Sequence, residues 1–276
     1  MVLIILPVNQ YGTLDDISKE YTEAGFKRAL VTYAVVRGLN GIISVAQGTE
    51  IAVEPVGIGL TFKPGEILDP VNDLVERFSW IVLASGTSLG IQKVLLNAGT
   101  WHWFRVAVSL ILVTTALLLW TRGEGSRQVR VPVIRLALIV ILLRFSVPVL
   151  TYGNELFYRH FLEPEYQVSS EKLKQTSLTL GDLNSKTQSE VQEEEGFSLF
   201  ENARRLYRST ADRINIEERI RVFREAAENI SEHTLNLIVI FVLQTLLIPL
   251  FYIWILLQLL KYFASGNLRL GHTDQD

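Results

Sequence analysis

The sequence predicts an all-α membrane protein, with three or four transmembrane helices and a long helical domain outside the membrane. The main evidence is three apolar runs, over residues 104–120, 131–152 and 235–263. At about 1.5 Å of rise per residue, each run is long enough to cross a hydrocarbon layer of ~30 Å. The mean hydropathy of +0.26, with 49% hydrophobic residues, fits a chain that is shared between bilayer and water.

Composition excludes several classes of function. The net charge is −3 and basic residues form no long run, which argues against a nucleic-acid partner. The chain has no cysteine, so it has no disulfide, thiolate nucleophile or thiolate metal site. We expect no metal, because the histidines are too far apart in sequence for a metal site: His102, His160, His233 and His272. We also expect no cofactor and no catalytic residue.

The first domain, residues 1–69, combines a long helix with a small β-hairpin. Thr13 is followed three residues later by Asp16, which is typical of a helix N-terminus. Apolar residues then recur with helical spacing at Ile17, Tyr21, Ala24, Leu30 and Tyr33. The second half of this helix is either a core helix or a poor membrane segment, and Arg37 favours the core helix. Alternating apolar residues near 49–62 predict the hairpin, which needs a packing neighbour to be stable.

The membrane domain, residues 70–152, contains two of the three clear spans, over residues 101–120 and 131–152. The third clear span is the final transmembrane helix over residues 235–263. Aromatic residues near the ends of these runs, such as Trp101 and Tyr152, fit interfacial anchors.

A further helix is expected to begin at Asp69 and Pro70, with the aspartate as N-cap and the proline in the first turn. Its stretch over residues 78–96 is nearly uncharged and either crosses the membrane or lies flat on it. A crossing places residues 1–69 in the cytoplasm, whereas a flat helix, with an anchor preceding Met1, places them outside.

Arginine places the loop between the first two spans in the cytoplasm. Three arginines stand there against Glu124, and short loops rich in basic residues stay cytoplasmic. These arginines are Arg122, Arg127 and Arg130. Residues 153–234 are then extracytoplasmic and the tail over 264–276 is cytoplasmic. We expect a bacterial inner membrane, with residues 153–234 in the periplasm.

The extracytoplasmic segment is acidic and carries a heptad pattern near its end. Between Tyr152 and Glu232 it has 16 acidic and 11 basic residues, and residues 163–196 form either a solvated helix or a disordered stretch. Apolar residues then step by four and three toward the last span, at Ile216, Ile220, Phe223, Ala227 and Ile230. This pattern is either an assembly seam between copies of the chain or a stripe that packs within one chain.

Arg144, near the middle of the second span, is the clearest candidate for an intramembrane polar site. A charge at that depth costs about 3 kcal/mol on insertion scales, so it faces a protein interior or water. We expect it to pair with Gln244 or with a carboxylate such as Glu155, either to lock helix packing or to line a hydrated path.

The segment from Gly86 to Gly90 supports two interpretations. Small residues at this spacing allow close helix packing in membranes. The same five residues also match a nucleophile elbow with Ser88 as nucleophile. We favour helix packing, because the repeated strand and helix units of that hydrolase fold are missing from the sequence.

We therefore expect a non-enzymatic integral membrane protein that is a self-assembling structural or pore-forming subunit. Its expected partners are the lipid bilayer and further copies of itself. One alternative is an accessory or sensor subunit that binds another protein through its extracytoplasmic domain. The other is a membrane-embedded serine hydrolase that uses Ser88.

Overall fold

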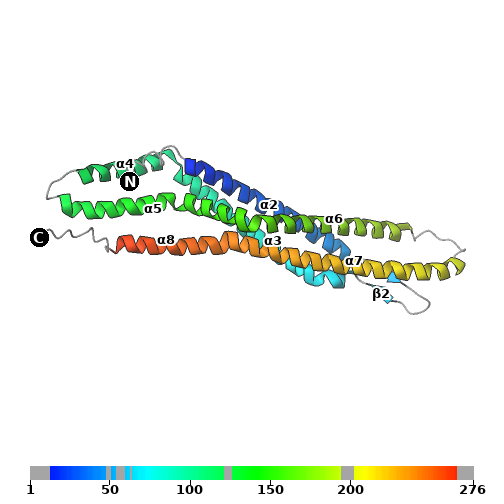
Figure 1. Cartoon of the computed structure of the whole chain (residues 1–276). Helices are drawn as coiled ribbons and strands as arrows, with labels where there is room; N and C mark the ends of the chain where they lie inside the picture. Colours follow the sequence, from blue (N-terminus) through cyan, green and yellow to red (C-terminus); the bar gives the residue numbers. More distant parts are fainter. Residues whose placement is uncertain are drawn as a thin grey trace. The chain divides into compact units, whose positions relative to one another are not determined.

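The computed structural model describes residues 13–47, 51–53, 60–62, 64–120, 126–193 and 202–265, nearly all of them helical (Figure 1). The α-helices are α2 (Thr13–Gln47), α3 (Pro64–Gly99), α4 (His102–Trp120), α5 (Ser126–Phe157), α6 (Glu163–Glu193), α7 (Asn202–Val242) and α8 (Ile248–Ala264). A π-helical turn, η1 (Tyr158–Leu162), joins α5 to α6, and a second, η2 (Leu243–Leu247), joins α7 to α8. The helical fold class expected from the sequence is confirmed.

Four helical runs are long and apolar enough to cross a membrane, namely Leu14–Gln47, Ile67–Gly99, Pro132–Ser185 and Ile220–Ala264. This supports an integral membrane protein. One assignment differs from expectation. The run Leu14–Gln47 qualifies although we expected a core helix, because its second half, residues 29–47, contains one charged residue, Arg37. Helix α4 is 19 residues long and its described apolar stretch is His102–Leu118, so the span expected over residues 101–120 stays a prediction.

One predicted helix start is wrong. Helix α3 begins at Pro64, so Asp69 and Pro70 lie inside its first turns instead of capping it. Asp69 instead accepts a hydrogen bond from the Gln47 side chain of α2 at 2.7 Å. Helix α7 continues without a break into η2 and α8, so the last span is the end of one long helical run. Residues 163–193 are helical, which confirms the helical alternative there.

Both π-helical turns come immediately before a proline. Turn η1 ends two residues before Pro164, and η2 ends two residues before Pro249. Proline has no N–H to donate, and its ring clashes with the carbonyl four residues earlier in a regular α-helix. A wider preceding turn relieves that clash, so the helix continues instead of breaking.

The segment between α2 and α3 contains two short strands. β1 (Ile51–Val53) pairs with β2 (Leu60–Phe62) in antiparallel register, with Ile51 opposite Phe62. Two strands of three residues are marginal by themselves. The residues that connect them lie outside the described part of the chain, so the hairpin predicted over 49–62 stays a prediction.

The chain forms two compact units. Unit 1 comprises Met1–Arg28, Ser85–His160 and Val242–Asp276, and unit 2 comprises Ala29–Ala84 and Phe161–Phe241. Within unit 1, α5 contacts both α4 and α8 (Figure 1). Unit 2 contains most of α6 and α7 together with the second half of α2 and the first half of α3.

Unit 2 has an apolar core. Phe78 and Phe241 are almost fully buried there, with their ring centroids 6.1 Å apart. Each helix contributes buried residues at steps of three and four, the period of helices that pack along one seam. On α2 these are Val36, Leu39, Ile43 and Ala46, and on α3 they are Leu68, Val71, Val75, Phe78 and Val82.

In unit 1 the buried residues are mainly polar, the reverse of unit 2. Among the described residues of unit 1, glycines aside, thirteen buried ones are polar or charged and eight are apolar, whereas unit 2 buries six and twenty respectively. The outside of unit 1 is apolar, with Trp120 at 87% and Leu110 at 66% exposure on α4, and Phe251 at 63% on α8. A polar interior under an apolar surface is stable where the surrounding medium is hydrocarbon.

Helix α2 shows this inversion most clearly. The apolar residues that predicted the helix do not mark its buried face, because Ile17 is 38% and Leu30 is 52% exposed. The buried face within unit 1 instead carries Asp15, Ser18 and Thr22. Both faces follow helical spacing, so the helix itself was predictable. Which of its two faces is buried was not.

Candidate intramembrane polar site

Arg144 forms a bidentate ion pair with Asp15 inside unit 1. Its Nη1 donates to Asp15 Oδ1 at 3.0 Å, and its Nη2 donates to Asp15 Oδ2. Both side chains are almost fully buried. Asp15 lies in the first turn of α2, where the helix dipole also favours a carboxylate. The charge of Arg144 is therefore neutralised by a residue that sequence analysis did not consider as its partner.

The contact between α2 and α5 continues one turn further along both helices. Ser18 of α2 donates its hydroxyl to the backbone carbonyl of Pro148 at 3.2 Å. Ser18 follows Asp15 by three residues and Pro148 follows Arg144 by four, so both contacts lie on one face of each helix. Polar groups thus connect α2 to α5 over two successive turns.

A second charged cluster lies further along the same two helices. The buried carboxylate of Glu155 accepts from Arg28 Nη2 at 2.9 Å and from Arg159 Nε at 3.0 Å. The Arg28 guanidinium lies 3.7 Å from the centroid of the Tyr158 ring, and that of Arg159 lies 4.8 Å from the Tyr21 ring. Glu155 was an expected partner of Arg144 but binds these two arginines instead.

A third polar group surrounds the π-helical turn η2. The Ser85 and Thr245 hydroxyls are 2.9 Å apart, and Ser88 donates to the Thr245 carbonyl at 3.4 Å. Asn154 donates its side-chain Nδ2 to the Gln244 carbonyl at 2.9 Å. Gln244 is thus buried in a polar environment, as expected of an intramembrane polar residue, and its backbone carbonyl bonds to Asn154.

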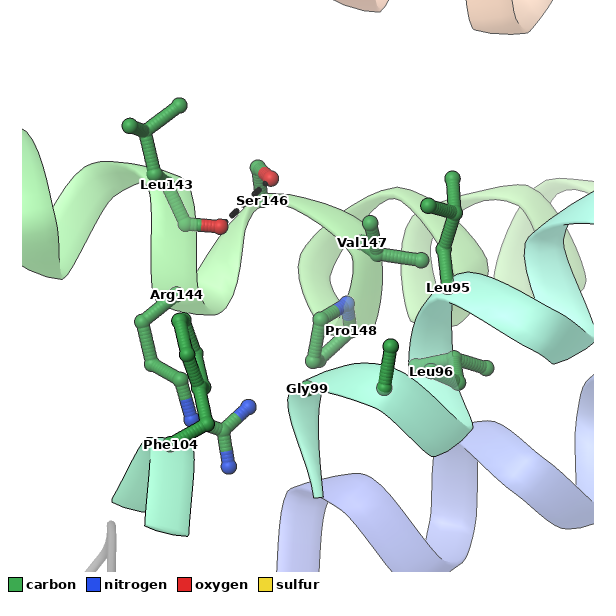
Figure 2. A pocket seen from close by; sticks show the side chains of 10 residues that line it. Leu95, Leu96, Gly99, Phe104, Leu143, Arg144, Ser146, Val147 and Pro148 are labelled. Atoms are coloured by element: carbon green, nitrogen blue, oxygen red, sulfur yellow. Dashed lines mark hydrogen bonds between the residues drawn. The ribbon is translucent and has the colours of Figure 1, made fainter. Parts of the chain in front are cut away.

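A pocket of about 330 Å³ lies beside Arg144. Figure 2 shows Arg144, Val147 and Pro148 of α5 facing Leu96 and Gly99 at the end of α3. A Cβ at Gly99 would lie 3.6 Å from Arg144 Nη1, an ordinary contact distance, so the end of α3 lies directly beside the guanidinium. The walls are mainly apolar, and the charge of Arg144 is already balanced by Asp15, so the pocket presents no uncompensated ion.

The glycines at 86 and 90 lie within the continuous helix α3. Gly86 is buried and Gly90 is half-buried, and a Cβ on Gly90 would lie 3.7 Å from the Phe26 ring of α2. Helix packing is therefore the better interpretation, here between α2 and α3 of one chain. The elbow interpretation of Ser88 is wrong, because an elbow requires a sharp turn between a strand and a helix.

The heptad pattern on α7 is largely covered by the chain itself. Phe223, Ala227 and Ile230 are buried, while Ile220 is half-buried. The pattern continues through Leu237 and Phe241 into the core of unit 2. This favours packing within one chain for these residues. The side chain of Ile216 lies outside the described part of the structure.

Asp15 is the member of this buried polar site that sequence analysis missed. Asp15, Ser18 and Thr22 repeat at steps of three and four, which is the signal of a polar helix face. That signal was hidden because the first turn of a helix normally contains acidic residues for capping reasons alone.

The described residues include no group of three or more His, Asp or Glu side chains able to hold a metal ion. His233 instead contacts the Ser169 hydroxyl through Nδ1 at 3.3 Å in unit 2. Comparison of the chain with protein-family models, with curated proteins and with solved structures found no match.

Proposed function

We propose that the protein is a non-enzymatic integral membrane subunit that acts by assembly with further copies of itself. Unit 1 is the membrane-embedded part in this proposal. The membrane location of unit 1 is supported by the buried pair of Asp15 and Arg144 under an apolar surface, and assembly is supported by the large apolar side chains exposed on α4 and α8. Buried charges of this kind require a protein interior, so the helices of unit 1 pack around the pair and separate it from lipid.

Of the two forms of this proposal, the structural subunit has more support than the pore lined by Arg144. A pore-lining arginine would face water, whereas Arg144 is 4% exposed and has both ends of its guanidinium on one carboxylate. Its arrangement suits a lock between α2 and α5. A pore formed between copies of the chain would have to be lined by other residues.

With the heptad face of α7 covered, the assembly surface in this proposal moves to unit 1. Helices α4 and α8 carry large exposed apolar side chains, including Leu110, Trp120 and Leu257. Phe251 and Trp254 stack on the surface of α8, with ring centroids 6.0 Å apart. Rigid aromatic side chains of this kind suit contacts with lipid and with a second copy.

Localisation follows the same proposal. Residues 161–241 lie outside the cytoplasm, in the periplasm of a bacterial cell, because the arginine-rich loop 121–130 stays inside. Residues 29–84 belong to the same compact unit as 161–241, which supports the same side for both. This replaces the boundary expected at residue 153 with one near residue 160.

The mass of the particle in mild detergent and in lipid nanodiscs tests the proposal. We expect a defined multiple of the chain mass of 31.2 kDa. Alanine at both Phe251 and Trp254 should lower that mass, whereas alanine at Val149, an exposed residue of α5, should not. A monomer in both media would contradict assembly, and ion flux in liposomes separates a pore-forming subunit from a structural one.

A further inference from the structure

The polar residues around η2 contain more hydrogen-bonding capacity than the described chain uses. We name the set Gln92 of α3, Thr151 and Asn154 of α5, and the carbonyl of Gln244 the η2 polar layer. All of its members belong to unit 1. We propose that this layer binds a monovalent metal cation, of the size of Na⁺ or K⁺.

Three buried oxygens of the layer have no hydrogen-bond donor among the described residues. They are Gln92 Oε1, Thr151 Oγ1 and Asn154 Oδ1. The three residues are 7%, 5% and 4% exposed, so water outside the protein does not reach them freely. Buried oxygens in a low-dielectric interior normally have a partner. Three such oxygens on two helices of unit 1 therefore indicate a bound species that interacts with oxygen lone pairs.

The contacts already described place Asn154 and Ser88 beside successive residues of η2 in unit 1. Asn154 donates to the Gln244 carbonyl and Ser88 donates to the next carbonyl along, that of Thr245. Asn154 Nδ2 makes the bond to Gln244, which assigns Oδ1 as the amide atom without a partner. Asn154 and Ser88 thus lie on either side of the same turn.

Thr151 and Gln92, which carry the other two oxygens, are each one helical turn from Asn154 and Ser88 respectively. Thr151 precedes Asn154 by three residues on α5, and Gln92 follows Ser88 by four on α3, so each pair shares a helix face. The ends of these two stretches meet, because Leu96 and Pro148 line the same pocket. The helices are therefore antiparallel at this level, and the step from Ser88 to Gln92 runs alongside the step from Asn154 to Thr151.

The chemistry of the layer selects a hard cation. Its candidate ligands are amide, hydroxyl and carbonyl oxygens, which suit Na⁺ and K⁺ and do not suit transition metals. Carbonyls at irregular helix turns inside membranes are known to coordinate such ions. The Gln244 carbonyl has a second lone pair beyond the hydrogen bond that it accepts from Asn154.

The charges around the layer favour a single positive charge over two. Ca²⁺ and Mg²⁺ sites normally include carboxylates. The nearby carboxylate, Glu155, is held by Arg28 and Arg159, and Asp15 is held by Arg144. The neutral layer can therefore stabilise one charge through its dipoles but offers no anion to balance a divalent ion.

Thr151→Val tests the site on the full-length protein in lipid nanodiscs. Valine has the shape of threonine and removes the hydroxyl oxygen that has no partner among the described residues. Equilibrium binding of ²²Na⁺, with K⁺ as competitor, should weaken about tenfold or more in this variant. Thermal unfolding in NaCl should lose its advantage over choline chloride at equal ionic strength. Without a cation the substitution should be neutral or stabilising, because it removes an unpaired polar group.

Thr115→Val is the matched control. Thr115 is also buried in unit 1, but its hydroxyl donates to the Ile111 carbonyl within its own helix. Cation binding should be unchanged in this variant. If Thr151→Val does not fold, Gln92→Met removes a second orphaned oxygen with little change in shape.

Two results would overturn the proposal. One is wild-type protein that binds no ²²Na⁺ and unfolds at the same temperature in NaCl, KCl and choline chloride, which would leave buried water as the occupant. The other is cation binding that Thr151→Val and Gln92→Met leave intact. Both results are independent of whether the chain assembles.

Discussion

Asp15 and Arg144 lie 129 positions apart in the chain and form a bidentate ion pair in the interior of unit 1. The pair ties the first turn of α2 to the middle of α5. Because both side chains are buried, each charge needs the other: either one alone would be an uncompensated ion in an apolar environment. The predicted polar residue and its unpredicted partner thus form one structural element.

Removal of one partner of this pair should destabilise the protein more than removal of both. We expect Arg144→Leu or Asp15→Leu to lower the free energy of unfolding by about 3–5 kcal/mol, and the double variant to lower it less than either. Reversible denaturation in mixed micelles measures all three. Additive effects of the two single substitutions would show that the ion pair does not form.

The sequence located the charge of Arg144 but not its environment, for a physical reason. Hydropathy identifies long apolar runs well, because crossing a bilayer requires an apolar composition along the whole run. It does not identify which helix approaches which. The buried face of α2 contains Asp15, Ser18 and Thr22, which resemble a solvated surface in sequence and become an interior only where lipid replaces water.

The helices were predictable where residues close together in the sequence carry the signal for a helix end or for helical spacing. Helix α2 is described from Thr13, where its sequence predicted an N-terminus, and α6 takes the helical alternative predicted for residues 163–196. Asp69 misled because capping residues also occur inside helices when tertiary contacts use their side chains, as Gln47 uses Asp69. Neither π-helical turn was foreseen, although a proline follows each.

Loss of the Glu155 carboxylate should cost more stability than loss of either arginine alone. Glu155→Gln leaves two guanidinium groups without their anion, and we expect a loss of about 2–3 kcal/mol. Arg159→Gln should cost less than about 1 kcal/mol, because the Arg159 side chain is 52% exposed and solvent screens it. The same denaturation assay measures both. An equal cost for the two substitutions would contradict the buried role of Glu155.

Ser88 should behave as a packing residue and not as a nucleophile. Its hydroxyl donates to the Thr245 carbonyl inside a helical unit, so a fluorophosphonate probe should not label the protein. Ser88→Ala should lower the free energy of unfolding by about 1 kcal/mol through loss of that hydrogen bond. In-gel fluorescence of the labelled wild type and variant checks this. Labelling that disappears in Ser88→Ala would restore the hydrolase alternative.

Cysteines introduced at Val45 and Leu178 should be labelled from the same side of the membrane. Both residues belong to unit 2 and are exposed, on α2 and α6 respectively. The chain contains no other cysteine, so an impermeant maleimide reports each position alone. We expect labelling from outside intact cells at both, and protection of a cysteine at Ser265. Labelling of Val45 and Leu178 from opposite sides would contradict a common location for unit 2.

The heptad face of α7 should stabilise the fold of one chain instead of the contact between copies. Ile230 is fully buried, so Ile230→Ala should lower the free energy of unfolding by about 2–5 kcal/mol and leave the mass of the detergent particle unchanged. Leu235 on the same helix is 52% exposed, and Leu235→Ala should change stability by less than about 0.5 kcal/mol. Denaturation combined with light scattering separates the two roles. A smaller particle with unchanged stability in Ile230→Ala would identify the face as an assembly seam after all, since only a contact between copies would be lost.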